Sequence, residues 1–241
     1  MSIGVLRYCK VFSINQFKEM RISNTSAFFL MLLLFNACKK DKPPTGLDNI
    51  YADFLVEHYS TLTSVTASFR MGSEQGELVE LDTNQYVLFE GLAMNFDEEN
   101  KRYKVQTNLK LNYSISWGEF GGQSFKNTIS DEALEMEDLP DTLDHKKSYN
   151  FFWKDSAPVK QNEMVVLGIT SSHTTLSTFA PAASMGGTSI HADMQNLIHI
   201  VGVDYMLNFS KHHTPPLSEL GEIGGRIHSI FYAPVKEVYI K

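Results

Sequence analysis

One segment alternates so regularly that it restricts the fold to one built on β-sheet. Between residues 102 and 117 the odd positions are mostly apolar and the even positions are polar. The odd positions hold Tyr103, Val105, Thr107, Leu109, Leu111, Tyr113, Ile115 and Trp117. Successive side chains of a strand point to opposite faces, so this pattern predicts one buried and one wet face. The segment exceeds the usual strand length of roughly 3–10 residues. We therefore expect a break near Asn108, and a turn at Gly121-Gly122 that leads into a hairpin partner at 125–129.

Many other short segments are rich in β-branched and aromatic residues and are bounded by turn signals. They are residues 65–70, 78–81, 86–89, 149–153, 164–170, 190–194, 203–209, 226–232 and 235–240. This pattern predicts an all-β fold with one or two immunoglobulin-like antiparallel β-sandwiches. Helical spacing of apolar residues predicts a short amphipathic helix over 47–58, with an edge strand as the alternative, and a second short helix is expected over 193–198.

The composition changes between the two halves of the body. Half of the residues in 131–144 are acidic. We interpret this segment as a solvated acidic linker between a first β-sandwich domain at 47–130 and a second at 145–241. The spacing of Tyr113 and Trp117 is repeated by Tyr149 and Trp153, which suggests two related halves. A single larger sandwich with an acidic loop is the competing interpretation.

A short apolar run lies near the amino terminus. Residues 27–35 are nine apolar residues, too few to span a bilayer, which needs roughly 20, but suited to the core of a secretory signal. The run leads to Phe35-Asn36-Ala37-Cys38, which resembles the lipobox of bacterial lipoproteins. The resemblance implies that residues 1–37 are a signal peptide and that Cys38 is the lipidated first residue of the mature chain. Met20 to Cys38 forms a complete signal, so a start at Met20 is favoured over a start at Met1 with a long basic region.

The same resemblance implies a location in the cell envelope. A cysteine that carries two or more acyl chains anchors a protein without a transmembrane helix. Lys39 stands where an aspartate would retain a lipoprotein in the inner membrane, which favours the outer membrane. Residues 38–46 are expected to form a flexible tether, and their basic start favours the periplasmic face over the cell surface. Two tripeptides, Asp141-Thr142-Leu143 and Asp155-Ser156-Ala157, resemble O-glycosylation acceptors of the Bacteroidota.

Cysteine content and charge exclude several functions. The chain has two cysteines, of which Cys9 would leave with the signal and Cys38 would carry lipid. The mature body therefore has no thiol for a disulfide, a nucleophile or a zinc site. Four of the 21 basic residues and one of the 28 acidic residues precede Cys38, which leaves a net charge of −10. An acidic body argues against nucleic acid as a partner, because phosphate binding needs clustered Lys and Arg.

Candidate sites for a metal are few. His191 and Asp193 would lie on one face of a strand, where imidazole and carboxylate could bind a divalent metal. Surface side chains without a ligand are the favoured interpretation, and no cofactor is expected. The adjacent His212 and His213 precede a proline-rich loop and are expected to face water. The acidic run 131–144 lacks the spacing of a calcium loop.

Aromatic residues offer the other candidate site. Trp117 and Trp153 could belong to a sugar-stacking face, although correct strand alternation would bury them in the core. The chain has no serine-hydrolase elbow, zinc-protease helix or phosphate-binding loop. We expect a non-enzymatic lipoprotein that acts as a binding or envelope-structural module, with an envelope protein or a glycan as its partner. A glycan-binding lipoprotein with exposed aromatics and a periplasmic hydrolase are the alternatives.

Overall fold

The computed structural model describes residues 46–154, 157–171 and 177–241. The chain divides into two compact units, Met1–Pro43 and Pro44–Lys241, and all described residues belong to the second. The predicted signal peptide, Cys38 and nearly all of the tether therefore lie outside the described residues. Within the described part of the chain, no helix has the length and apolar character needed to cross a membrane.

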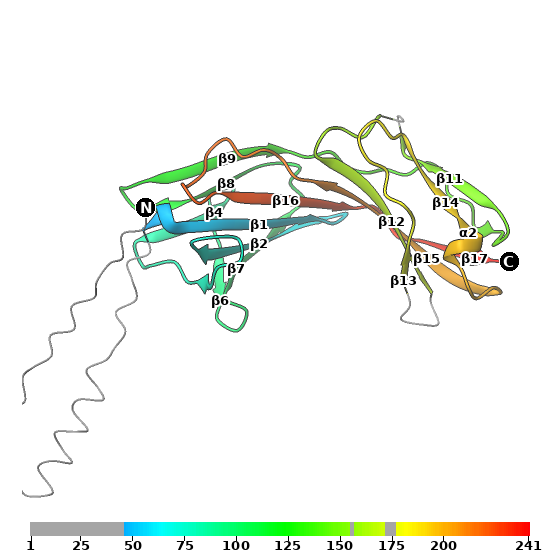
Figure 1. Cartoon of the computed structure of the whole chain (residues 1–241), viewed down its shortest axis with the longest axis horizontal. Helices are drawn as coiled ribbons and strands as arrows, with labels where there is room; N and C mark the ends of the chain where they lie inside the picture. The colour runs from blue at the N-terminus through cyan, green and yellow to red at the C-terminus, as the bar shows by residue number, and fades with distance from the viewer. Residues whose placement is uncertain (1–45, 155–156, 172–176) are drawn as a thin grey trace, which may run out of the picture. The chain divides into compact units, whose positions relative to one another are not determined.

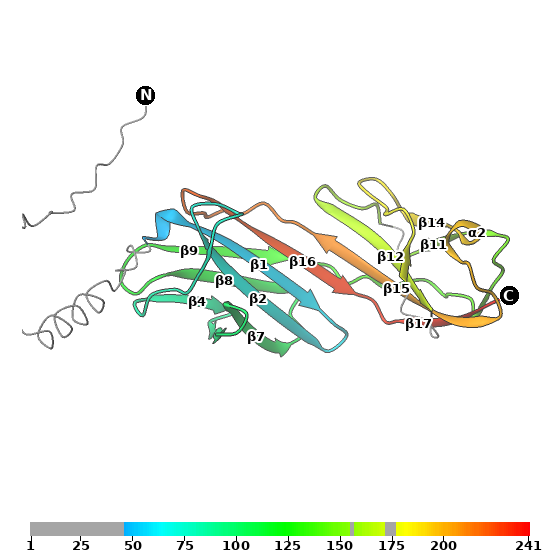
Figure 2. The same cartoon turned by 60° about the horizontal axis from the view of Figure 1, so that its bottom comes forward.

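The described residues are mostly β-strand and form several sheets (Figures 1 and 2). The strands in the first part of the chain are β1 (Ile50–His58), β2 (Leu62–Met71), β3 (Leu78–Val79), β4 (Gln85–Phe89), β5 (Leu92–Ala93), β6 (Asn95–Asp97), β7 (Arg102–Asn108), β8 (Asn112–Glu119) and β9 (Ser124–Ser130). They are followed by β10 (Thr142–Leu143), β11 (Ser148–Phe152), β12 (Glu163–Ser171), β13 (Ser177–Phe179), β14 (Ser189–Asp193), β15 (Val203–His213), β16 (Gly225–Tyr232) and β17 (Lys236–Ile240). A 3-10 turn, η2 (Leu47–Asn49), precedes β1, and a short helix, α2 (Met194–Leu197), follows β14.

One hydrophobic core forms where two sheets pack face to face. The four-stranded sheet β5-β4-β8-β9 covers the part of the large sheet that contains β1, β2, β7 and β16. The ring of Phe69 on β2 lies against Trp117 on β8, with ring centroids 5.5 Å apart. We call this the amino-terminal core. It contains buried residues from Leu47 to Ile129 and also Ile227, which comes from far along the chain.

A second core forms around the other end of the large sheet. There β12, β15 and β17 pair side by side, and the two-stranded sheet β11-β14 supplies further apolar residues. Phe151 of β11 meets Phe209 of β15 edge to face, with centroids 5.6 Å apart. We call this the carboxy-terminal core. Its buried residues run from Leu134 to Ile240.

Strand β16 is shared between the two cores. It runs parallel to β1, in a register that begins with Ala52 opposite Gly225, and antiparallel to β15 (Figure 2). Ile227 belongs to the amino-terminal core, whereas Phe231 belongs to the carboxy-terminal core. Both cores therefore depend on β16.

The prediction of a helix over 47–58 is wrong. Residues 50–58 form β1, which lies between β2 and β16 and is not an edge strand. Its even positions are buried, and the residues there are Ile50, Ala52, Phe54, Val56 and His58. The helical spacing arose because partly apolar residues also occupy the outer face, so both periods fit the same segment.

The predictions for 102–129 are confirmed in most respects. The alternating segment divides into β7, which ends at Asn108, and β8, which begins at Asn112, and β9 pairs with β8 as the hairpin partner. Tyr113, Ile115 and Trp117 are buried in the amino-terminal core. Leu109 and Leu111 lie in the break between β7 and β8 and instead pack, partly buried, against the carboxy-terminal core.

The acidic segment 131–144 is not uniformly solvated, contrary to its interpretation as a solvated linker. Leu134 and Leu143 are buried in the carboxy-terminal core, and the side chain of Asp131 is 5% exposed. The apolar residues that interrupt the acidic run hold the segment against the body, since burying them removes apolar surface from water. The division into two domains at this segment stays a prediction.

Candidate functional site

The two tryptophans proposed as ligand contacts lie inside the cores. Trp117 is 1% exposed and Trp153 is 6% exposed. The indole N–H of Trp153 donates to the carbonyl of Ala157 at 2.8 Å. Neither ring presents an open face for stacking against a sugar, so the glycan interpretation loses the two residues on which it depended.

The proposed metal ligands have other partners. Nδ1 of His191 lies 2.9 Å from the side-chain oxygen of Asn150. Asp193 caps the first turn of α2, accepting from the backbone N–H of Gln195 and the side chain of Asn196. This confirms the predicted helix start, since such a carboxylate satisfies an N–H that has no partner within the helix. Among the described residues no group of three or more His, Cys, Asp or Glu is placed to hold a metal ion.

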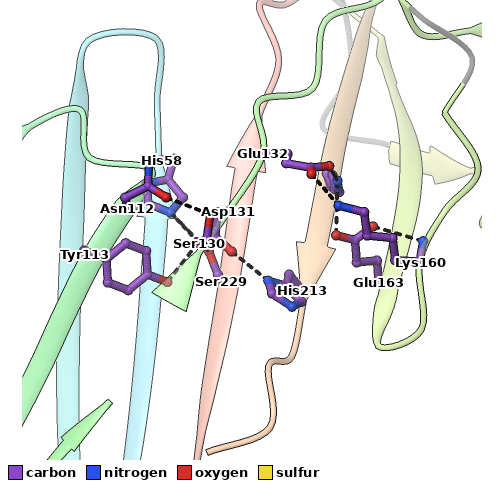
Figure 3. A network of polar contacts seen from close by, with 11 residues as sticks. His58, Asn112, Tyr113, Ser130, Asp131, Glu132, Lys160, Glu163, His213 and Ser229 are labelled. Atoms are coloured by element: carbon purple, nitrogen blue, oxygen red, sulfur yellow. Dashed lines mark hydrogen bonds and ion pairs between the residues drawn. The ribbon is translucent and has the colours of Figure 1, made fainter. Parts of the chain in front are cut away.

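A buried polar cluster lies where the two cores meet. We call it the Asp131 cluster, and its members are His58, Thr63, Tyr113, Asp131, His213 and Ser229. Figure 3 shows these residues except Thr63. The residues come from β1, β2, β8, β15, β16 and the residue that follows β9. Segments far apart in the sequence thus meet at one carboxylate.

Asp131 accepts hydrogen bonds on both carboxylate oxygens. Oδ1 lies 2.7 Å from Nδ1 of His213. Oδ2 lies 2.9 Å from Nε2 of His58 and accepts from the hydroxyls of Tyr113 at 2.9 Å and Ser229 at 2.5 Å. An ionised carboxylate can only accept, so the facing nitrogens of both histidines carry protons.

The hydrogen bonds determine the ionisation of the cluster. Burial alone would raise the pKa of Asp131, but the hydrogen bonds from His213, His58, Ser229 and Tyr113 outweigh it and hold that pKa well below its usual range. Burial raises the pKa of Tyr113 far above its usual value, and the charge of Asp131 adds to the effect. Asp131 is therefore an anion and Tyr113 a neutral donor at neutral pH.

The serine, histidine and aspartate of this cluster do not form a catalytic triad. In a triad the histidine stands between serine and aspartate, with one on each ring nitrogen. Here Ser229 and Asp131 both approach Nε2 of His58, while Nδ1 faces Thr63 at 3.1 Å. The hydroxyl of Ser229 donates directly to Asp131, and the adjoining cavity has a volume of only about 10 Å³. That volume is about what one water needs, so the cluster suits a structural role.

A second histidine contact lies on the opposite face of β15 and β16. Nδ1 of His212 is 3.1 Å from Nε2 of His228, and Nε2 of His212 is 3.0 Å from the hydroxyl of Ser210. Burial lowers the pKa of both rings. The neighbouring His228 lowers the pKa of His212 further, and the charge of Arg226 lowers that of His228 further. The predicted water-facing histidines are thus half-buried and bonded, His213 to Asp131 and His212 to His228.

The Asp131 cluster was not predicted, although some of its signals are present in the sequence. Inward alternation along 203–209 continues through Lys211 to His213 and places His213 on the same side of β15 as Phe209. Alternation along β1 likewise leads to His58. The role of Asp131 had no local signal, because its partners come from distant segments.

A groove lies beside the junction of the two cores. It has a volume of about 620 Å³ and is open to solvent, and we call it the junction groove. Its apolar lining includes Leu109, Met136, Leu139, Tyr232, Pro234 and Val235. Tyr232 also stacks on Tyr59, with ring centroids 5.1 Å apart. Glu137 and Asp138 lie on the wall formed by residues 133–139.

Comparisons with known proteins add little to this geometry. No family model and no curated protein matches the chain. Among solved structures, the crystal structure of domains A168-A170 from titin aligns with a TM-score of 0.21 and 9% sequence identity. The match covers 78% of this chain and 61% of that chain, so this chain spans less than two thirds of the titin fragment. A TM-score this low assigns neither fold family nor function.

Proposed function

We propose that this chain is a non-enzymatic lipoprotein, anchored through Cys38 to the outer membrane, whose body is a binding or envelope-structural module on the periplasmic face. We assign the body to immunoglobulin-like β-sandwiches as part of the same proposal. The run of apolar residues before Cys38 supports the anchor, and the face-to-face sheets of the amino-terminal core support a sandwich.

The observation that carries the non-enzymatic part is the closed Asp131 cluster. The reactive side chains brought together there converge on the carboxylate of Asp131, and Ser229 has no free base and no room for a substrate. A general base must reach the proton that it abstracts in a plausible substrate pose. The cluster therefore supports a structural or binding role for the body.

The anchor is tested by labelling cells with a clickable fatty-acid analogue and separating their membranes. We expect the wild-type chain to carry the label and to sediment with the outer membrane, and the Cys38→Ser chain to do neither. Cys9→Ser is the matched control, because Cys9 would leave with the signal peptide and its loss should change nothing. Equal labelling of the Cys38→Ser chain would refute the anchor.

The binding role is tested by formaldehyde cross-linking in whole cells. We expect the wild-type chain to form a discrete adduct larger than the monomer and the unanchored Cys38→Ser chain to lose it. An anchored chain that forms no adduct with any envelope component would count against a binding module.

A further inference from the structure

The junction groove has an extended wall with an unused backbone edge. On one side, the N–H of Glu137 donates to the carbonyl of Phe152 at 3.0 Å and the N–H of Lys154 donates to the carbonyl of Glu135 at 2.8 Å. These bonds flank an isolated antiparallel bridge between Met136 and Trp153. Successive peptide groups of an extended chain point in opposite directions, so the N–H and C=O of Met136 point away from Trp153.

Residues 133–139, which carry this free edge, line the junction groove. Trp153 does not line the junction groove, whereas residues 133–139 form one wall and Pro234–Lys236 form part of the other. No backbone hydrogen bond within the described part of the chain engages the N–H or C=O of Met136. Pro234, on the opposite wall, has no backbone N–H and therefore cannot donate a hydrogen bond to Met136. An unpaired strand edge is a template for pairing with another chain.

The side chains of the groove define the chemistry of an occupant. Val235 is 57% exposed beside the half-buried Met136 and Leu139, so the groove leaves apolar surface in water. Two lysines also line the groove, and each is paired with a carboxylate, Lys154 with Glu135 at 2.7 Å and Lys236 with Asp141. Glu137 and Asp138 take part in no salt bridge among the described residues. Apolar side chains and basic side chains would complement this surface, and an acidic partner would be repelled.

We infer that the junction groove binds an extended segment of a partner protein, which adds as a β-strand along residues 133–139. The partner's alternate apolar side chains pack on Leu109, Met136 and Val235, and its basic side chains lie beside Glu137 and Asp138. Main-chain hydrogen bonds supply affinity in this mode of recognition, and the pockets for alternate side chains supply specificity. The inference deepens the proposed binding role and rests on it.

The test measures fluorescence anisotropy of a labelled probe peptide with the full mature lipoprotein in detergent. The probe alternates valine with lysine over about seven residues, within the usual length of a strand. We expect saturable binding of this peptide. A peptide with glutamate in place of lysine should bind at least tenfold more weakly. A peptide with the same side chains but N-methyl groups on alternate amides should not bind, because it cannot pair with Met136.

Two variants and two matched controls locate the binding. Val235→Asp places a charge on the apolar wall, and Glu137→Lys reverses the charge on the other wall. Each should weaken probe binding at least tenfold. Val201→Asp and Glu98→Lys make the same changes at exposed positions away from the groove, and should stay within about twofold of wild type. Circular dichroism confirms that all four chains are folded.

Several results would overturn the inference. They are absence of saturable binding, equal binding of the N-methylated peptide, or a Val235→Asp chain that binds as wild type does. If a second copy of the chain fills the groove, light scattering will report a dimer that Val235→Asp dissociates, and this also overturns the inference. The anchor and cross-linking experiments do not involve the groove, so the proposed function can survive failure here.

Discussion

A single carboxylate holds together segments from both cores. Asp131 bonds to side chains from β1, β8, β15 and β16 and is almost completely buried. A buried charge is tolerated only when it is paired and hydrogen-bonded. These four elements must therefore converge correctly before Asp131 can leave water, which makes the cluster a test of correct assembly.

Asp131→Ala should cost about 3–5 kcal/mol of unfolding free energy, as breaking a buried ionic network does. The substitution removes the acceptor and leaves the buried donors of His58, Tyr113 and Ser229 without it. Urea denaturation measures the loss. Asp138→Ala, an exposed position on the same segment, should stay within about 0.5 kcal/mol. A loss below about 1 kcal/mol for Asp131→Ala would mean that the network contributes little.

The His212–His228 pair should make stability depend on pH. Burial lowers both pKa values below the unfolded value of about 6.5, with Arg226 lowering that of His228 further and Asp53 opposing it. As pH falls below about 6.5 the unfolded chain takes up protons that the folded pair still refuses, so the unfolding free energy falls until the folded pKa values are reached. The urea midpoint should therefore decrease as the pH is lowered from about 7.5 to about 5.

The control for this pH effect is the double variant His212→Asn/His228→Asn. It keeps polar side chains in place but cannot titrate, so its urea midpoint should fall less steeply over the same pH range. The difference between the two slopes isolates the pair from other titrating groups. Identical slopes in both chains would exclude the pair as the source.

At the scale of elements, strand content was predictable and strand partners were not. Alternation is a local property, and it correctly predicted β7, β8 and β9, including the break near Asn108. The parallel pairing of β1 with β16 has no local signal, because it depends on where a distant strand packs. The Asp131 cluster was unpredictable for the same reason. Alternation places His58 and His213 on inward faces, but only the assembled sheets bring them to Asp131.

The strand character of residues 50–58 can be tested with neighbouring substitutions. Phe54 is buried in the amino-terminal core and meets Phe69 edge to face at 6.0 Å, so Phe54→Ala should cost about 3–5 kcal/mol. Leu55 lies on the opposite face and is partly exposed, so Leu55→Ala should cost clearly less. Chemical denaturation of both chains measures the difference, and equal losses would contradict one-sided burial.

At the scale of the whole described body, two cores share a strand and each holds one tryptophan. Trp117 lies in the amino-terminal core and Trp153 in the carboxy-terminal core, and the chain has no other tryptophan. Because β16 contributes to both cores and the Asp131 cluster joins them, loss of one core removes support from the other. We therefore expect the two cores to unfold together.

Single-tryptophan chains report the two cores separately. Trp153→Phe leaves the signal of the amino-terminal core, and Trp117→Phe leaves that of the carboxy-terminal core. Their fluorescence transitions should each coincide with the loss of circular dichroism measured on the same chain, as two-state unfolding requires. Addition of Asp131→Ala should separate the fluorescence transition of one core from the dichroism curve. Separate transitions without that change would show that the cores are independent.

The pairing of β1 with β16 also sets the order of events when the chain is made. Asp53 and Arg226, which face each other in these strands, are 173 positions apart in sequence. A chain that leaves a ribosome or a translocon amino terminus first exposes β1 long before β16 arrives, and such distant pairings form slowly. During that interval β1 has an open edge on the side that β16 will occupy. A chaperone bound to β1, or fast delivery of the rest of the chain, would limit the exposure of this edge until the last part of the protein emerges.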